Sequence, residues 1–216
     1  MSRTRLSGLY GITDSSLQPT TQDLLTAAEQ ALDGGMKMLQ YREKRLPTAQ
    51  QESQAKQLRQ LCIQYDALLI VNDDVELALA VDAHGVHLGK SDGNTGLARQ
   101  QLGSDRIIGT SCYNQIELAI QAQEQGADYV AFGRFFDSLT KPDAVQAMPE
   151  LLTRAKKQLS IPLCAIGGIR LDNALVVVEQ GADMIAVIHD LFSAQDVQQR
   201  ARDFSALFSS QQVSAE

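Results

Sequence analysis

Short runs of apolar and β-branched residues recur along the chain, and a longer segment with helical spacing follows each of them. We expect eight strands, at residues 9–13, 36–42, 67–72, 85–88, 106–111, 129–133, 162–167 and 184–188. Successive strand starts lie roughly 17 to 34 residues apart, which leaves room for a helical crossover each time. This alternation predicts an α/β protein with a parallel sheet.

The segments between these runs carry apolar residues three and four positions apart, as one buried helix face requires. Three such stripes are Leu24, Ala28, Ala31 and Leu32; Ala55, Leu58, Cys62 and Tyr65; and Ala174, Val177 and Val178. The junctions repeat as well, since Gly-Ala-Asp occurs at 126–128 and again at 181–183, and Gly-Gly occurs at 34–35. Glycine just past a helix supplies a left-handed C-terminal cap, so these positions mark helix ends.

Eight strand–helix units with repeated glycine caps predict a single (β/α)8 TIM barrel over residues 1–216, with a polar tail from about 209. An open doubly wound sheet is the alternative, although it usually has fewer strands and a glycine-rich first turn. Residues 141–148 contain Pro142 and few apolar side chains, so we expect a loop there that could act as a lid.

Composition narrows the functional classes. Hydrophobic residues make up 44% of the chain and the formal net charge is −7, which favours a globular protein and argues against a nucleic-acid binder. The three cysteines are widely spaced and form neither a disulfide framework nor a metal-site pattern. We see no signal peptide and no membrane span, so we expect a cytoplasmic protein. The sequence leaves a homo-oligomer open.

Polar chemistry begins at the end of the strand at 36–42. Alternate residues of a strand share one face, so Gln40, Arg42 and Lys44 point together, following Met36 and Met38 on the same side. A planar guanidinium and a compact ammonium both suit phosphate oxygens. We therefore predict an anion site, against the alternative that these charges lie solvated on a surface strand.

Two further strand ends carry acidic and amide groups. Asn72 ends the inward row of the strand at 67–72, and Asp73 follows it. Asp73 is well placed to join Asp92 on a magnesium ion, which prefers one or two carboxylates together with phosphate oxygens. The alternative is that Asn72, Asp73 or Asp74 simply caps the next helix. His87, on the following strand, is either structural or a ligand contact.

The remaining strand ends offer further polar groups. Ser111 at the rim could donate to a substrate, and no histidine–acid pair at motif spacing makes it a nucleophile. The cluster Ser138, Thr140 and Lys141 suits a phosphate, or is a solvated loop. Gly167-Gly168 lets backbone amides approach an anion, or is a simple turn. The segment 188–190 opens a short helix where phosphate sites of barrels recur.

One cationic face, one candidate acid pair and two separate candidate anion sites indicate two phosphorylated small molecules bound together, one of them with a metal. Joining the two molecules, with pyrophosphate as the leaving group, is the reaction that this set of groups favours.

With these motifs, the sequence resembles a known family, the thiamine phosphate synthases. The resemblance extends from about residue 9 to about residue 193 and rests on Tyr10-Gly11-Ile12-Thr13-Asp14, Gln40-Tyr41-Arg42-Glu43-Lys44, Asn72-Asp73, Gly85-Val86-His87-Leu88-Gly89, Gly109-Thr110-Ser111, Thr140-Lys141 and Ala165-Ile166-Gly167-Gly168-Ile169. It implies a transferase that joins 4-amino-5-hydroxymethyl-2-methylpyrimidine diphosphate to hydroxyethylthiazole phosphate, through a dissociative route with Mg²⁺.

The resemblance also implies roles for individual residues. Gln40, Arg42, Lys44 and Asn72 would contact the pyrimidine diphosphate, and Asp73 and Asp92 would hold Mg²⁺. Ser111 and Lys141 would reach the diphosphate, so the catalytic set would be Lys141, Arg42 and Ser111. Ser138 and Thr140 would bind the thiazole, and Gly168, Ile188 and His189 its phosphate.

The chain departs from the family pattern at Lys90, Arg134, Asp137, Ser138 and His189. Most of these changes fall on the thiazole side. Two alternatives remain open from the sequence: a thiazole tautomerase-like relative, which would not need the magnesium and diphosphate set, and a non-catalytic barrel that binds thiamine phosphates.

Overall fold

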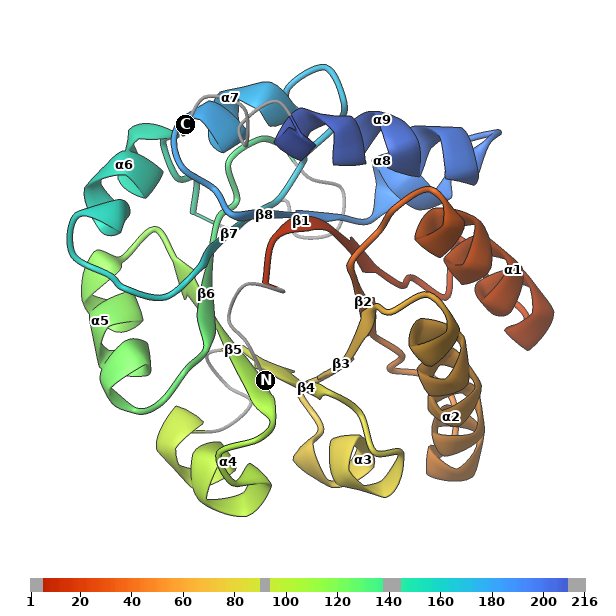
Figure 1. Ribbon diagram of the computed structural model, residues 1–216. Coiled ribbons are helices and arrows are strands. Elements are labelled where there is room, and N and C mark those ends of the chain that lie inside the picture. Colours follow the sequence, from red (N-terminus) through yellow and green to blue (C-terminus); the bar gives the residue numbers. More distant parts are fainter. Residues whose placement is uncertain (1–5, 90–93, 138–144, 210–216) are drawn as a thin grey trace.

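The computed structural model describes residues 6–89, 94–137 and 145–209. Eight parallel strands pair in chain order and β8 pairs with β1, so the sheet closes into a barrel (Figure 1). The strands are β1 (Gly8–Ile12), β2 (Met38–Tyr41), β3 (Leu68–Asn72), β4 (Gly85–Leu88), β5 (Ile107–Tyr113), β6 (Tyr129–Phe132), β7 (Leu163–Ile166) and β8 (Met184–Val187). Every predicted strand is present with its ends shifted by two residues or fewer, and closure rules out the open sheet.

Helices form a ring around the barrel (Figure 1). They are α1 (Thr21–Asp33), α2 (Thr48–Gln64), α3 (Val75–Ala80), α4 (Thr95–Leu102), α5 (Ile116–Glu124), α6 (Glu150–Lys156), α7 (Ala174–Glu179), α8 (His189–Phe192) and α9 (Val197–Ser209). In the part of the chain that the structure describes, no helix has the length and apolar character needed to cross a membrane.

Helix α1 illustrates how the sequence determines where a helix begins and which of its faces is buried. Thr20 Oγ1 accepts from the Asp23 N–H at 3.1 Å, and the Asp23 carboxylate accepts in return from the Thr20 N–H at 3.2 Å, which is a capping box. Such a cap contributes about 1 kcal/mol. The stripe predicted for this helix, Leu24, Ala28, Ala31 and Leu32, is its buried face.

The core has two layers, as alternation in a closed barrel requires. Side chains inside the barrel include Tyr10, Met38, Ile70 and Tyr129, while a larger apolar layer lies between the strands and the helices. Met38 is inside, as predicted, but Met36 belongs to the outer layer, which corrects the prediction that both share a face. The reason is that β2 begins at Met38, and the two-residue period holds only within extended backbone.

The repeated Gly-Ala-Asp motif has the same structural role at both of its positions: it ends a helix and binds the backbone of a neighbouring strand. Gly126 and Gly181 have φ values of 93° and 106°, so they form the left-handed caps that the sequence predicted. The carboxylate of Asp128 accepts from the Ile108 N–H of β5 at 2.8 Å, and that of Asp183 accepts from the Leu163 N–H of β7 at 2.7 Å. Each aspartate thus satisfies a backbone donor at the amino end of a neighbouring strand.

Candidate active site

A pocket of about 320 Å³ opens at the carboxyl ends of the strands. The residues that line it come from all eight strands or from the loops that follow them, among them Gln40, Arg42, Asn72, Ser111, Gly168 and His189. In barrels of this architecture the carboxyl ends of the strands carry the chemistry, whereas the amino ends serve stability. The pocket is therefore the candidate active site.

The predicted anion-binding face of β2 divides between the pocket and its rim. Gln40 is buried and Arg42 is half-buried, and both line the pocket. The main chain of Arg42 is fixed by Thr13, whose Oγ1 accepts from the Arg42 N–H at 2.8 Å and donates to its carbonyl at 3.3 Å. Lys44 is exposed, and its Nζ lies 3.4 Å from Asp73 Oδ2.

The segment after β1 forms a turn that Asp14 stabilises. Its carboxylate accepts from the backbone N–H and the hydroxyl of Ser16 at 2.9 and 2.7 Å. Desolvation acts to raise the pKa of the Asp14 carboxyl, but the hydrogen bonds from Ser16 and the positive charges of Arg42 and Arg45 outweigh it, and the pKa lies below its ordinary value. Asp14 therefore stays ionised near the cationic side of the pocket.

Three consecutive polar residues after β3 have three different surroundings. Asn72 lines the pocket, and its Nδ2 donates to Asp73 Oδ2 at 2.5 Å. Asp73 has a φ of 64°, a left-handed conformation that Asp tolerates better than most residues. Asp74 caps α3 by accepting from the Leu77 N–H at 2.8 Å, so the capping alternative holds for this aspartate.

A chain of hydrogen bonds crosses the interior of the barrel at the base of the pocket. Gln40 Nε2 donates to Tyr10 Oη at 2.7 Å, and Tyr10 Oη lies 2.9 Å from Tyr129 Oη. Tyr129 Oη lies 2.9 Å from His87 Nδ1, and His87 Nε2 lies 2.9 Å from Ser111 Oγ. His87, which the sequence left between a structural role and a ligand contact, both lines the pocket and belongs to this chain.

Burial governs the ionisation of the two tyrosines. Desolvation raises the pKa of both phenols well above the ordinary value. Tyr10 and Tyr129 are 1% and 0% exposed and stay neutral throughout the physiological range. The chain between Gln40 and Ser111 therefore passes through two neutral hydroxyl groups.

On the opposite wall, the loops after β6 and β7 lie against each other without space for added atoms. A Cβ at Gly168 would overlap the backbone of Phe136 and Asp137, and its φ of 66° favours glycine as well. Phe136 N–H donates to the Gly167 carbonyl at 3.0 Å. Arg134 Nη1 lies 2.6 Å from Asp137 Oδ1. These two residues, which both depart from the family pattern, therefore form an ion pair with each other.

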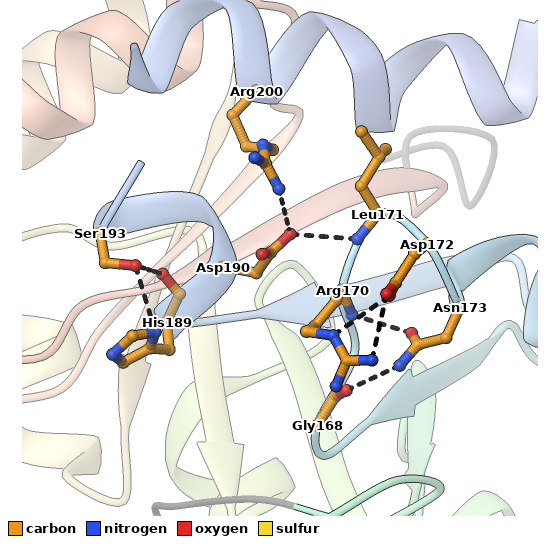
Figure 2. A network of polar contacts seen from close by, with 9 residues as sticks. All are labelled: Gly168, Arg170, Leu171, Asp172, Asn173, His189, Asp190, Ser193 and Arg200. Atoms are coloured by element: carbon orange, nitrogen blue, oxygen red, sulfur yellow. Dashed lines mark hydrogen bonds and ion pairs between the residues drawn. The ribbon is translucent and has the colours of Figure 1, made fainter. Parts of the chain in front are cut away.

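The loop after β7 is joined to α8 and α9 through one carboxylate. Figure 2 shows Asp190 between two partners: its Oδ2 accepts from the Leu171 N–H at 3.0 Å and from Arg200 Nη1 at 2.7 Å. In the same loop, Asn173 Nδ2 donates to the Gly168 carbonyl at 3.1 Å. His189 is exposed at the pocket, and its Nδ1 lies 3.1 Å from Ser193 Oγ.

Several predicted residues lie outside the described ranges, namely Asp92, Ser138, Thr140 and Lys141, together with Lys90. Within the described ranges, no three side chains of histidine, cysteine, aspartate or glutamate cluster as a metal site would need. Of the predicted magnesium pair, only Asp73 can be placed. Cys62, Cys112 and Cys164 are all buried, and none of them is in a disulfide.

The sequence assigned no role in the site to Tyr10, Tyr129 or Arg170, although Tyr10 opens one of the motifs that carry the family resemblance. Tyr10 and Arg170 line the pocket, and Tyr129 joins Tyr10 to His87. Strand alternation could have found the tyrosines, because both occupy inward positions of predicted strands. An aromatic residue at such a position is indistinguishable from ordinary core until its hydroxyl partner is known.

Comparison with known proteins agrees with the resemblance noted in the sequence. The family model for thiamine monophosphate synthase matches residues 9–191. The thiamine-phosphate synthase of Alcanivorax borkumensis is 53% identical over 207 residues, covering 94% of this chain and 95% of that protein. The one from Thioalkalivibrio sulfidiphilus is 49% identical over 204 residues, covering 94% and 96%.

A solved structure agrees in fold as well as in sequence. The thiamine phosphate pyrophosphorylase from Pyrococcus furiosus superimposes with a TM-score of 0.87 at 38% identity, covering 96% of this chain and 98% of its own. Both the (β/α)8 fold and the synthase resemblance are thereby confirmed. The chain belongs to the thiamine monophosphate synthase family, and is a transferase of thiamine biosynthesis.

Proposed function

We propose that this pocket joins 4-amino-5-hydroxymethyl-2-methylpyrimidine diphosphate to hydroxyethylthiazole phosphate. The bond between the methylene carbon and the diphosphate oxygen breaks, and its electrons leave with pyrophosphate. The lone pair of the thiazole nitrogen then forms the new carbon–nitrogen bond. The observation that carries the proposal is the pocket itself, where Gln40, Arg42 and Asn72 face a wall formed by Gly167 and Gly168.

The pyrimidine diphosphate is proposed to lie on the cationic side. Gln40 and Asn72 would contact it through their amides, Arg42 through its bidentate fork, and Lys44 from the rim. Arg42 is suited to this role because its main chain is already held by Thr13. Ser111 and Lys141 complete the proposed set around the diphosphate.

Magnesium is the proposed metal, with Asp73 and Asp92 as its protein ligands. The surroundings of Asp73 fit such an ion, because its partly exposed carboxylate is a hard oxygen donor beside the pocket-lining Asn72. Mg²⁺ commonly uses only one or two carboxylates and takes its other ligands from water and substrate phosphates. When bound, the ion would neutralise charge on the departing diphosphate.

The proposed route is dissociative, so the protein stabilises the departing group before the new bond forms. Arg42, Ser111 and Lys141 would do so by donating hydrogen bonds to the diphosphate oxygens as negative charge accumulates on them. The pocket would then hold the thiazole nitrogen within reach of the pyrimidine methylene cation, which favours capture over reaction with water.

The thiazole phosphate is proposed to lie on the opposite wall. Gly168 would offer a backbone amide, and the turn at Ile188 and His189 would hold the phosphate beside it. Ser138 and Thr140 would contact the thiazole. Support comes from the lining of the pocket, which includes Gly168, Ile188 and His189.

Thiamine phosphate formation by the purified chain with both substrates and Mg²⁺ tests the reaction. We expect turnover that needs all three additions and releases one pyrophosphate for each thiamine phosphate. The tautomerase alternative is tested by supplying a thiazole carboxylate precursor without the pyrimidine. A tautomerase would isomerise this precursor. Tight product binding without turnover would identify a non-catalytic binding protein and overturn the proposal.

Lys141→Ala tests the leaving-group role. We expect kcat to fall by about a hundredfold or more while the KM for the thiazole phosphate changes little, because the charge acts mainly as the diphosphate departs. Equal losses in both quantities would contradict that role.

We further propose that the protein meets its small phosphorylated substrates in the cytoplasm, and that any assembly it forms is a homo-oligomer.

A further inference from the structure

We propose that Tyr10 and Tyr129 are positioning residues that set the direction of the hydrogen bonds in the pocket. They would hold the Gln40 amide with its carbonyl free to accept from the pyrimidine, and leave the Ser111 hydroxyl free to donate to the diphosphate. The inference rests on the proposed function, since it concerns the groups that meet the pyrimidine diphosphate.

The contacts that carry the inference form one continuous path. Four hydrogen bonds of 2.7 to 2.9 Å link Gln40, Tyr10, Tyr129, His87 and Ser111, which come from five different strands. Both tyrosines are almost fully buried, so bulk water does not compete for their hydroxyl groups. Position 109 makes room for the path, because a Cβ there would overlap the Tyr129 ring.

Counting protons gives the path a direction. A neutral phenol has one proton to donate. Tyr10 Oη accepts from Gln40 Nε2, and the other group within hydrogen-bond distance of this buried hydroxyl among the described residues is Tyr129 Oη, so we assign the Tyr10 proton to Tyr129. By the same reasoning, the Tyr129 proton goes to His87 Nδ1. A neutral imidazole that accepts at Nδ1 carries its proton at Nε2. His87 therefore donates to Ser111 Oγ, and the Ser111 proton is left for another acceptor.

The two ends of the path then match the two parts of one substrate. At one end, the Gln40 carbonyl suits a ring that carries an amino group. At the other end, the Ser111 hydroxyl can donate to an anionic diphosphate oxygen. If the path ran the opposite way, Gln40 would present N–H groups to the ring and Ser111 would donate to His87, so neither end would match.

The direct test is the tautomer of His87. In wild-type protein labelled with ¹⁵N-histidine at about pH 8, we expect His87 to carry its proton at Nε2 and to have an unprotonated Nδ1. His84 is an internal reference of the same tautomer, because its Nδ1 accepts from the Leu69 N–H at 2.8 Å. The chain has only three histidines, so His189→Asn completes the assignment. A proton on Nδ1 of His87 would overturn the inference.

Kinetics supply the functional test. Tyr129→Phe and Tyr10→Phe each remove one hydroxyl and keep the ring, and we expect kcat/KM for the pyrimidine diphosphate to fall about tenfold in each. The KM for the thiazole phosphate should stay within about twofold. In Tyr129→Phe, the His87 Nδ1 resonance should also shift, because this nitrogen loses the hydrogen bond from Tyr129.

Tyr41→Phe is the matched control. Tyr41 is equally buried and also loses one hydrogen bond, from its hydroxyl to Gln54 Oε1 at 2.8 Å, but it belongs to the outer layer and not to the pocket. We expect its kinetics to stay within about twofold of wild type. Unchanged kcat/KM in both path variants, or equal losses for both substrates, would overturn the positioning role. Because wild-type turnover is measured separately, such a result leaves the proposed reaction standing.

Discussion

The ammonium nitrogen of Lys44 lies 3.4 Å from Oδ2 of Asp73, the same oxygen that accepts from Asn72 Nδ2 at 2.5 Å. One carboxylate oxygen thus contacts a cation from the loop after β2 and an amide at the end of β3. This contact brings together the two strand ends that the sequence had predicted separately as an anion site and a metal site. A divalent cation bound at Asp73 would lie close to the Lys44 ammonium, so the proposed metal site and the proposed anion site would be electrostatically coupled.

The first prediction concerns Asp73→Asn. Replacing the carboxylate by an amide removes a charged oxygen ligand, so we expect at least about tenfold more Mg²⁺ to be needed for half-maximal activity. The measurement is a magnesium titration of turnover at saturating substrates. Asp74→Asn is the control, because asparagine caps a helix as well as aspartate does and α3 keeps its cap. An unaltered titration for Asp73→Asn would remove Asp73 from the metal site.

Most of the fold could be predicted because it depends on local patterns. Eight apolar runs of strand length, helical stripes between them and glycine at helix ends each follow from backbone geometry that neighbouring residues determine. The strand at 85–88 was predicted with its observed bounds, Gly85–Leu88. Met36 shows the limit, since a side chain just before a strand has no alternation to fix which layer it enters.

The site was harder to predict because it depends on partners that are distant in sequence. That Gln40 and Asn72 line one pocket follows from the fold, but their orientation depends on hydrogen bonds to other strands. Tyr10 and Tyr129 are 119 residues apart, and nothing in either strand's sequence shows that their hydroxyls meet. By contrast, Arg134 and Asp137 form an ion pair three residues apart, a contact that depends on local sequence alone.

The second prediction concerns Arg42→Lys. Lysine keeps the charge but loses the planar fork, so we expect kcat/KM for the pyrimidine diphosphate to fall about tenfold or more. The main chain should stay in place, because Thr13 binds the backbone of residue 42 and not its side chain. Steady-state kinetics with the diphosphate varied provides the check.

Arg45→Lys is the matched control for this substitution. Arg45 is exposed and lies 4.0 Å from Glu43, an arrangement that contributes little. Its kinetics should therefore equal those of the wild type. Wild-type kinetics in Arg42→Lys would instead show that a point charge is sufficient at this position and that no bidentate contact exists.

The third prediction compares two arginines on α9. Arg200→Gln removes one of the two partners of Asp190, which connects α8 to the loop after β7 (Figure 2). We expect the KM for the thiazole phosphate to rise about threefold to tenfold, because this loop contains Gly168 and α8 begins at His189. The KM for the pyrimidine diphosphate should change less than about twofold.

Arg202→Gln is the control on the same helix. Arg202 pairs with Asp33 at 3.8 Å on an exposed surface away from the pocket, so both KM values should stay at wild-type levels. If Arg200→Gln behaves like Arg202→Gln, the connection through Asp190 has no influence on the thiazole side.

The last prediction concerns alkaline pH and the three buried thiols. Burial raises the pKa of Cys62 and Cys112 to about 12, and that of Cys164 further still. Near pH 9 the unfolded chain loses these protons, whereas the folded chain keeps them. The contribution of the buried thiols to the free energy of unfolding is therefore fully present below pH 9. Above pH 9 the free energy of unfolding falls by about 1.4 kcal/mol per thiol per pH unit. Urea titrations between pH 8 and 10 should show this slope, and Cys164→Ala should reduce it by one thiol's share. Iodoacetamide should label the native protein at pH 8 only as fast as it unfolds, and rapid labelling would show that the thiols are accessible.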